Sequence, residues 1–281
     1  MNEYPYPFSP DVMPLWHIMV FVIGACIGSF LNVCIWRIPR DESIVTAPSH
    51  CPKCGHDIAW YENIPLLSWV VLNGKCSKCK APITFRYFCV ELLTAVLFYI
   101  LFYKVTFDHQ PLSILIVYFG VTMLIVTTIF IDIEHFLIPD KTTYPVILLG
   151  LAASLIFPEI WGVSTTRLHS FIFSAAGLLI GGGIMALMAI FGKMLFKVEA
   201  LGWGDVKYIA AVGACLGLKA CFFSVLFGSL TGAVAGVGIM FFKHRNLKTA
   251  IPFGPFLAAG TFIWMFYGER LTVLYLQLLR H

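Results

Sequence analysis

Apolar residues occur along the chain in eight long runs, separated by shorter segments that hold most of the charged residues. A run of about 20 apolar residues is long enough for a helix to cross the roughly 30 Å of hydrocarbon in a bilayer. The sixth run is short, and its boundary with the seventh is weakly marked. The pattern predicts an all-α polytopic membrane protein with about eight transmembrane helices, at 14–36, 89–107, 112–131, 143–160, 169–192, 206–219, 221–242 and 251–267.

The composition agrees with this interpretation and excludes an ordinary soluble domain. Hydrophobic residues make up 59% of the chain and charged residues 12%, with a mean hydropathy of +0.85, whereas a soluble domain has about 25% charged residues. Membrane lipid is therefore the expected partner of most of the surface. The net charge of +4 is weak evidence for nucleic-acid binding, and we expect none. Residues 1–14 contain no Lys or Arg, so we expect no cleaved signal peptide.

Basic residues predict the orientation. Seven Lys and Arg residues lie between the first two predicted spans, from Arg37 to Arg86, and loops rich in basic residues stay on the cytoplasmic side. The segment 37–88 is therefore predicted to be a cytoplasmic loop, which leaves the N-terminus outside. Alternating spans place most of the remaining basic residues inside as well, and an even number of spans places both termini outside.

Two aspartates interrupt apolar sequence: Asp132 in "IFIDIEHFLIPDK" (129–141) and Asp205 in "LGWGDVKYIA" (201–210). In the predicted topology each lies at the cytoplasmic end of a span, so we expect both carboxyl groups at one depth. Acidic groups at the edge of the hydrocarbon tend to face the bundle interior and to mark functional sites. Two carboxyl groups that share a site do not both ionise readily, so one keeps a proton as general acid and the other activates a water. Such a pair can hydrolyse a peptide bond without a covalent intermediate.

Charge alone leaves a second interpretation open, because a proton or cation pathway would use the same two aspartates. Gly202 and Gly204 lack a Cβ and are expected to let substrate backbone or the partner acid approach Asp205. Asp140 is interpreted as the N-cap of the fourth span, and Lys207 is expected to face the headgroups.

A cysteine cluster is the most specific local signal. Two C-x2-C pairs lie in the predicted cytoplasmic loop, and paired knuckles of this kind supply four thiolates for tetrahedral zinc. Disulfides are the alternative, but thiols stay reduced in the cytoplasm. Four cysteines leave no open coordination position, so the metal should organise the loop and not catalyse. The predicted zinc ligands are Cys51, Cys54, Cys76 and Cys79.

Five segments together resemble the bacterial type IV prepilin peptidases, also called prepilin leader peptidase/N-methyltransferases. They are "GSFLNVCIWRIPR" (28–40), "ENIPLLSWVVLNGKCSKCKAPI" (62–83) with the cysteine pairs, "DIEHFLIPD" (132–140), "GWGDVK" (202–207) and "IPFGPFLAAG" (251–260). The resemblance implies an enzyme of the bacterial inner membrane with its active site facing the cytoplasm. In this family the aspartates of the third and fourth segments are the catalytic pair, which are Asp132 and Asp205 here.

The resemblance further implies two activities and their partners. The enzyme cuts the basic leader from prepilins or pseudopilins, which serve type IV pili or type II secretion, and then methylates the new N-terminus with S-adenosylmethionine. Structural Zn²⁺ and this methyl donor are the implied cofactors, and no residue is assigned to the donor. The implied domains are a first transmembrane helix at 14–36, a zinc-binding loop at 37–88 associated with methylation, and a transmembrane aspartic peptidase domain at 89–281.

Two other functions are weighed against the peptidase. A transporter would use Asp132 and Asp205 as a proton or cation path, but we find no internal repeat of the kind that transporters show. A non-catalytic assembly protein, with the zinc loop docking cytoplasmic partners, would leave the paired acids unexplained.

Overall fold

The structure is a computed structural model that describes residues 12–45, 49–162, 166–197, 201–243 and 251–278. Over these ranges the chain is helical and contains no β-strand; the only sheet-like pairings there are two isolated antiparallel bridges, His50 with Asp57 and Lys75 with Pro82. Contacts divide the chain into two compact units, residues 3–110 and 111–281. The fold class is thus helical, as predicted.

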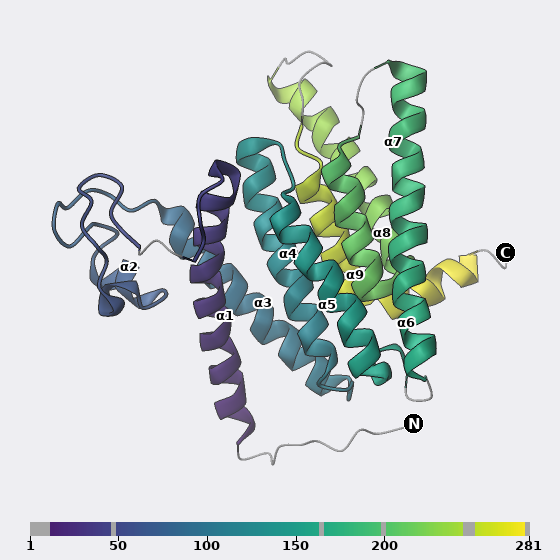
Figure 1. Cartoon of the computed structure of the whole chain (residues 1–281), viewed down its shortest axis with the longest axis horizontal. Coiled ribbons are helices and arrows are strands. Elements are labelled where there is room, and N and C mark those ends of the chain that lie inside the picture. The colour runs from purple at the N-terminus through teal and green to yellow at the C-terminus, as the bar shows by residue number, and fades with distance from the viewer. Residues whose placement is uncertain (1–11, 46–48, 163–165, 198–200, 244–250, 279–281) are drawn as a thin grey trace. The chain divides into compact units, whose positions relative to one another are not determined.

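The first unit is a pair of long helices with a loop domain between them (Figure 1). Its helices pack antiparallel and closely, since a Cβ on Gly28 would lie 2.7 Å from the Cα of Glu91, and Asn32 Nδ2 donates a hydrogen bond to the Tyr87 carbonyl at 3.0 Å. Small residues permit such close approach in membrane helices. The elements are α1 (Met13–Arg37), η1 (Ile38–Arg40), η2 (Trp60–Asn63), α2 (Leu67–Val71) and α3 (Phe85–Phe107).

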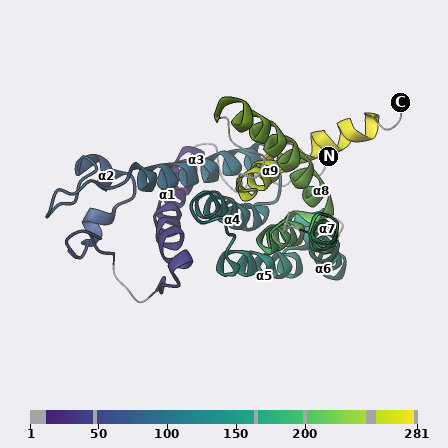
Figure 2. The ribbon, with the colours of Figure 1, turned by 90° about the horizontal axis from the view of Figure 1, so that it is seen from above.

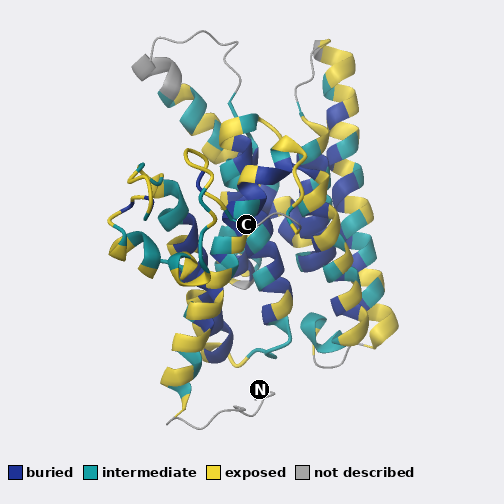
Figure 3. Cartoon of the chain, turned by 60° about the vertical axis from the view of Figure 1, so that its left-hand side comes forward, coloured by how far each residue is buried: buried dark blue, intermediate teal, exposed yellow. Residues whose placement is uncertain are grey.

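The second unit is a helical bundle arranged around α8, which packs against α4, α5, α6, α7 and α9 (Figures 1 and 2). Its buried residues, dark blue in Figure 3, gather where these helices face one another. The elements are α4 (Ile114–His135), α5 (Asp140–Ile156), η3 (Pro158–Trp161), α6 (Arg167–Ala176), the π-helical η4 (Gly177–Gly181), α7 (Gly182–Phe196), α8 (Trp203–Lys243) and α9 (Gly254–Leu278).

The helix α8 is broken at Gly217, which has φ 80° and ψ 177°. Glycine adopts this left-handed φ without the clash that a Cβ would cause, and Trp161 packs directly against the break. The break lies within the predicted span 206–219, two residues before its end, close to the boundary with 221–242 that the apolar pattern marked only weakly. Each of the eight predicted apolar runs overlaps a helix of the structure.

Five segments among the described residues are long and apolar enough to cross a membrane: Met13–Arg40, Phe85–Phe107, Ile114–His135, Arg167–Leu195 and Trp203–Gly238. The chain is therefore a multi-pass membrane protein. The larger number of about eight crossings stays a prediction, since α5 has 17 residues and α9 is not among the five.

Candidate active site and metal centre

Asp132 lies in the last turn of α4, where its side chain is buried. The backbone N–H of Gly254, the first residue of α9, donates a hydrogen bond of 2.8 Å to Asp132 Oδ2. A helix N-terminus carries unpaired N–H groups and a partial positive charge, both of which favour a carboxylate. The start of α9 thus holds one oxygen of Asp132 in place.

Asp205 lies in the first turn of α8 and is also buried. The backbone N–H of Gly202 donates a hydrogen bond of 3.2 Å to its Oδ2. This is the bond of a capping box in which the side chain of the third helical residue accepts from the N-cap N–H. Asp132 is near enough for its charge to act on the Asp205 carboxyl group. The two predicted acids therefore interact electrostatically within the second unit, each with one oxygen held by the backbone N–H of a glycine.

Two further contacts bring the start of α8 against the segment that follows α4. A Cβ on Gly204 would lie 3.0 Å from the Cβ of Ile138, so this glycine permits the close packing of α8 on the segment after α4. Lys207 Nζ lies 2.6 Å from Asp140 Oδ1. These contacts fix the relative positions of α4, α5 and α8 close to both acids.

Asp140 differs from its sequence interpretation. The N-cap of α5 is Pro139, and Asp140 is the first helical residue, with no side-chain capping bond. Its carboxylate pairs with Lys207 instead, so the lysine expected to face headgroups has a partner within the chain. An acid in the first turn of a helix is stabilised there by the helix dipole even without a cap.

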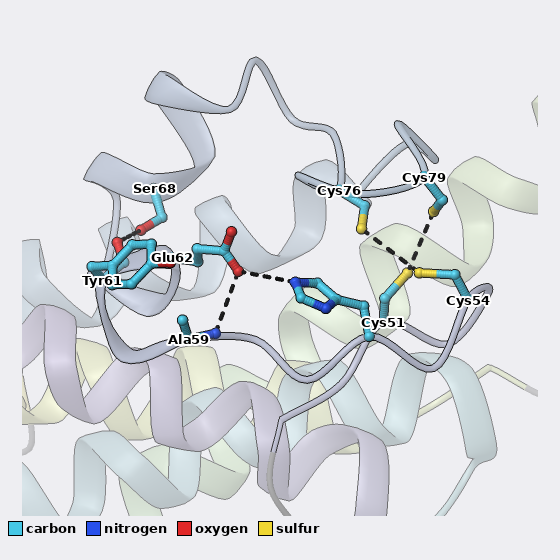
Figure 4. A network of polar contacts seen from close by, with 9 residues as sticks. Cys51, Cys54, Ala59, Tyr61, Glu62, Ser68, Cys76 and Cys79 are labelled. Atoms are coloured by element: carbon cyan, nitrogen blue, oxygen red, sulfur yellow. Dashed lines mark hydrogen bonds and ion pairs between the residues drawn. The ribbon is translucent and has the colours of Figure 1, made fainter.

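The four cysteines form two equivalent knuckles in the loop of the first unit (Figure 4). In each knuckle the carbonyl oxygen of the first cysteine accepts a hydrogen bond from the backbone N–H four residues later. Gly55 N donates to Cys51 at 2.9 Å, and Lys80 N donates to Cys76 at 3.1 Å. Gly55 and Lys80 both have a positive φ. The two short segments therefore have the same turn, although they differ in sequence.

The geometry of the cluster fits a tetrahedral metal ion. The four Sγ atoms lie within 4.8 Å of one another, with Cys51 to Cys79 at 3.9 Å and Cys54 to Cys76 at 4.0 Å. Zinc with four thiolates at about 2.3 Å requires sulfurs about 3.8 Å apart, whereas a disulfide requires about 2.05 Å. All four cysteines are free, so the structure favours the metal over the disulfides.

Backbone N–H groups prepare some of these sulfurs for ionisation. Those of Cys54 and Lys53 lower the pKa of the Cys51 thiol to about 6, and those of Cys79 and Lys78 lower the pKa of Cys76. At Cys54 the His56 N–H lowers the pKa, but burial and the neighbouring thiols outweigh it and raise the value to about 11. Four adjacent thiols do not all ionise without a cation among them, which is what a bound metal supplies.

Glu62 connects the two knuckles. A hydrogen bond from the Ser77 hydroxyl, one from Ala59 N at 3.3 Å and the nearby His56 ring together lower the pKa of its carboxyl group, and His56 Nε2 lies 3.5 Å from Glu62 Oε2 (Figure 4). The Glu62 carboxyl group therefore holds the two knuckles to each other and to the turn that begins at Ala59.

Comparison with known proteins identifies the family. Residues 22–105 match the bacterial peptidase A24 N-terminal domain, and residues 118–237 match the type IV leader peptidase family. A prepilin leader peptidase/N-methyltransferase of Aeromonas salmonicida (strain A449) is 35% identical over 288 residues, covering 94% of each chain. The protein of that name from Pseudomonas aeruginosa (strain PAO1) is 32% identical, covering 91% of this chain and 92% of the relative. The chain belongs to the type IV leader peptidase family.

A third relative matches over a smaller share of its length. The prepilin leader peptidase/N-methyltransferase of Myxococcus xanthus (strain DK1622) is 40% identical over 224 residues, which cover 80% of this chain and 63% of that protein. No solved structure matches the chain. The division at residues 110 and 111 separates the ranges of the two family matches.

In this family member, sequence reasoning missed one residue of the site. Gly254 was recognised only as part of the last characteristic segment, and its bond to Asp132 joins residues 122 positions apart. The available signal was the Gly254–Pro255 pair at the start of an apolar run, since proline near the first helical position marks a helix N-terminus.

Proposed function

We propose that this chain cleaves the leader peptide of type IV prepilins or pseudopilins, with Asp132 and Asp205 as its catalytic pair. The observation that supports the proposal is that two buried carboxyl groups, from α4 and α8, interact electrostatically and each have one oxygen held by a glycine N–H. The relatives named above are prepilin leader peptidases, and the type IV leader peptidases are aspartic proteases.

The two acids divide the work of hydrolysis. One carboxylate accepts a proton from a water, which attacks the carbonyl carbon of the scissile peptide. The other carboxyl group donates its proton to the carbonyl oxygen, which gives a tetrahedral diol. As the diol collapses, the first acid passes the proton it took from the water to the leaving nitrogen, and the second acid recovers a proton from a diol hydroxyl. In each acid the oxygen that accepts a glycine N–H is fixed, so the second oxygen is the one free to exchange the proton.

The site suits a substrate that is apolar on one side of the cut and basic on the other. Both acids lie at helix ends, Asp132 in the last turn of α4 and Asp205 in the first turn of α8. A prepilin has a basic leader and an apolar helix, so its scissile bond reaches the membrane surface where such helix ends lie. We place this surface on the cytoplasmic side of the bacterial inner membrane, with eight crossings, because the basic residues favour that topology.

We assign N-methylation of the new N-terminus to the same chain, because its relatives carry both activities in their names. Cys51, Cys54, Cys76 and Cys79 would hold one Zn²⁺, which stabilises the loop between the first two helices and leaves no coordination position for chemistry. S-adenosylmethionine would supply the methyl group. We assign peptide cleavage to 89–281, which contains both acids, and associate methylation with the loop at 37–88 that follows the first helix, 14–36.

A transporter that uses the two aspartates as an ion path is not supported, because the relatives are peptidases. The proposal is tested by mass spectrometry of the N-terminus of a candidate prepilin, incubated in membranes with and without the enzyme. We expect loss of the leader mass, followed by a gain of one methyl group when S-adenosylmethionine is added. An unchanged N-terminus for every prepilin or pseudopilin encoded alongside this chain would contradict the proposal.

A further inference from the structure

The segment Trp60–Val71 in the loop of the first unit exposes large apolar side chains. Trp60 is 82% exposed, and three residues of α2 are exposed to a similar degree: Leu67 by 62%, Val70 by 57% and Val71 by 75%. Single exposed apolar residues are common, but several within one short segment usually mark a surface that contacts another apolar phase.

Contacts within the first unit place this segment alongside the start of α3. The backbone N–H of Leu66 donates a hydrogen bond of 2.8 Å to Glu91 Oε2. The ring of Trp69 packs on those of Phe85 and Phe88, with centroids 5.4 and 5.2 Å apart. The start of α2 thus lies beside Glu91, and its middle lies beside the first turn of α3.

The depth of α2 in the membrane follows from α3. Phe85–Phe107 is one of the segments able to cross a bilayer, and its 23 residues are about 35 Å long, against about 30 Å of hydrocarbon. Glu91 is about 9 Å along α3 from Phe85. Because α3 crosses the bilayer, Glu91 lies deeper in the membrane than Phe85. The segment that is hydrogen-bonded to Glu91 therefore reaches the headgroup layer.

Polar groups at that depth are satisfied within the chain. Glu91 is buried and accepts hydrogen bonds from Leu66 N and from the Ser29 hydroxyl. Leu66 has φ 63°, an unfavourable conformation for a leucine that turns its N–H toward the acid. On α3, Phe85 is also exposed, beside Trp69 on the side of α2 that packs against α3.

We propose that Trp60–Val71 is an interfacial segment: α2 lies in the headgroup layer of the bilayer beside α3, with Leu67, Val70 and Val71 in contact with phospholipid. The occupant is lipid because Leu66 and Trp69 hold α2 beside the first two turns of a membrane-spanning helix. Tryptophan and tyrosine are enriched at this level of membrane proteins, and short amphipathic segments bury their apolar side about 5–10 Å into it. The loop is thereby held against the membrane between its two transmembrane helices.

The test uses a fluorescent non-canonical amino acid at Val71, and separately at Leu67, in the full chain reconstituted in phosphatidylcholine nanodiscs. A matched control carries the same group at Lys53, an exposed residue of the first cysteine knuckle. Quenching is measured with nitroxide lipids labelled in the headgroup, near the top of the acyl chain or near its end, and with iodide in the water. The metal content of each labelled chain, compared with that of the unlabelled chain, shows that the loop is folded.

We expect headgroup and shallow acyl nitroxides to quench Val71 and Leu67 at least about twofold more than Lys53, as an apolar side chain at the interface requires. Iodide should quench Lys53 more than either. Quenching at Val71 and Leu67 by iodide alone would overturn the proposal, because α2 would then face water. Protection from both quenchers would also overturn it, because protein and not lipid would then cover α2.

Discussion

Replacing Gly254 with alanine would place a methyl group against the carboxylate of Asp132. The added Cβ would lie 2.7 Å from Asp132 Oδ2 and 2.9 Å from Thr128 Cγ2. Ordinary contacts of a Cβ begin at about 3.4 Å, so α9 and α4 must separate by several tenths of an ångström. The hydrogen bond from Gly254 N to Asp132, 2.8 Å long in the structure, then lengthens beyond useful range.

The expected loss follows from that bond. A hydrogen bond to a charged group contributes about 1.5–3 kcal/mol, which corresponds to about 10- to 150-fold in kcat/KM. Displacement of Asp132 from its partner acts in the same direction, because misplacing a catalytic group by about 1 Å can cost about 100-fold. The assay is the rate of prepilin cleavage in reconstituted vesicles, with methylation of an already cleaved pilin as a measure of the first unit.

Gly232→Ala is the matched control, because this glycine of α8 also lies at a contact between helices, here with α9, but its added Cβ would be 3.5 Å from the nearest atom of Phe256. We expect this variant to cleave within about twofold of wild type, as ordinary van der Waals contact implies. Gly254→Ala should keep its methylation while cleavage falls. Equal cleavage rates for Gly254→Ala and Gly232→Ala would refute the idea that the N-terminus of α9 positions Asp132.

Two further predictions concern the loop and the ion pair. Replacing Cys51 and Cys54 with serine should remove the metal and reduce methylation more than cleavage, because half of the thiolates are lost. The control is Cys26→Ser, in α1. An unchanged zinc content of the Cys51/Cys54 variant, measured by atomic absorption, would count against the metal site. Lys207→Met should lower cleavage by less than about fivefold, because a partly exposed ion pair such as Lys207–Asp140 contributes about 0–1 kcal/mol. A loss as large as that of Gly254→Ala would instead place Lys207 in the chemistry.

The long apolar runs were sufficient to predict where helices occur, because each apolar run must form all its backbone hydrogen bonds internally in lipid. The boundary that the pattern marked weakly, near residue 219, corresponds to the break at Gly217. The cysteine spacing was similarly informative, because the hydrogen bonds that shape a C-x2-C turn lie within the turn itself. The topology, which places helix ends at a common depth, predicted that Asp132 and Asp205 interact, and the structure has an electrostatic interaction between them; their role as a catalytic pair stays a prediction.

The parts that could not be predicted depend on contacts between distant residues. Local capping rules pointed to Asp140 as an N-cap, but its partner Lys207 lies 67 positions away. The hydrogen bond of Gly254 with Asp132 depends on how α9 packs against α4, and the bond between Leu66 and Glu91 depends on the path of the whole loop. None of these has a repeating pattern in the sequence.

The most direct test of the catalytic pair is cleavage of one prepilin by wild type, Asp132→Asn and Asp205→Asn in the same vesicles. Asparagine keeps the size of the side chain but neither accepts the proton of a water nor donates one of its own as an acid. Both variants should lose cleavage by at least about 1,000-fold, since each acid of a pair is needed, and both should still methylate a cleaved pilin. Wild-type cleavage by either variant would show that its aspartate has no part in the reaction, and the two acids would then not be a catalytic pair.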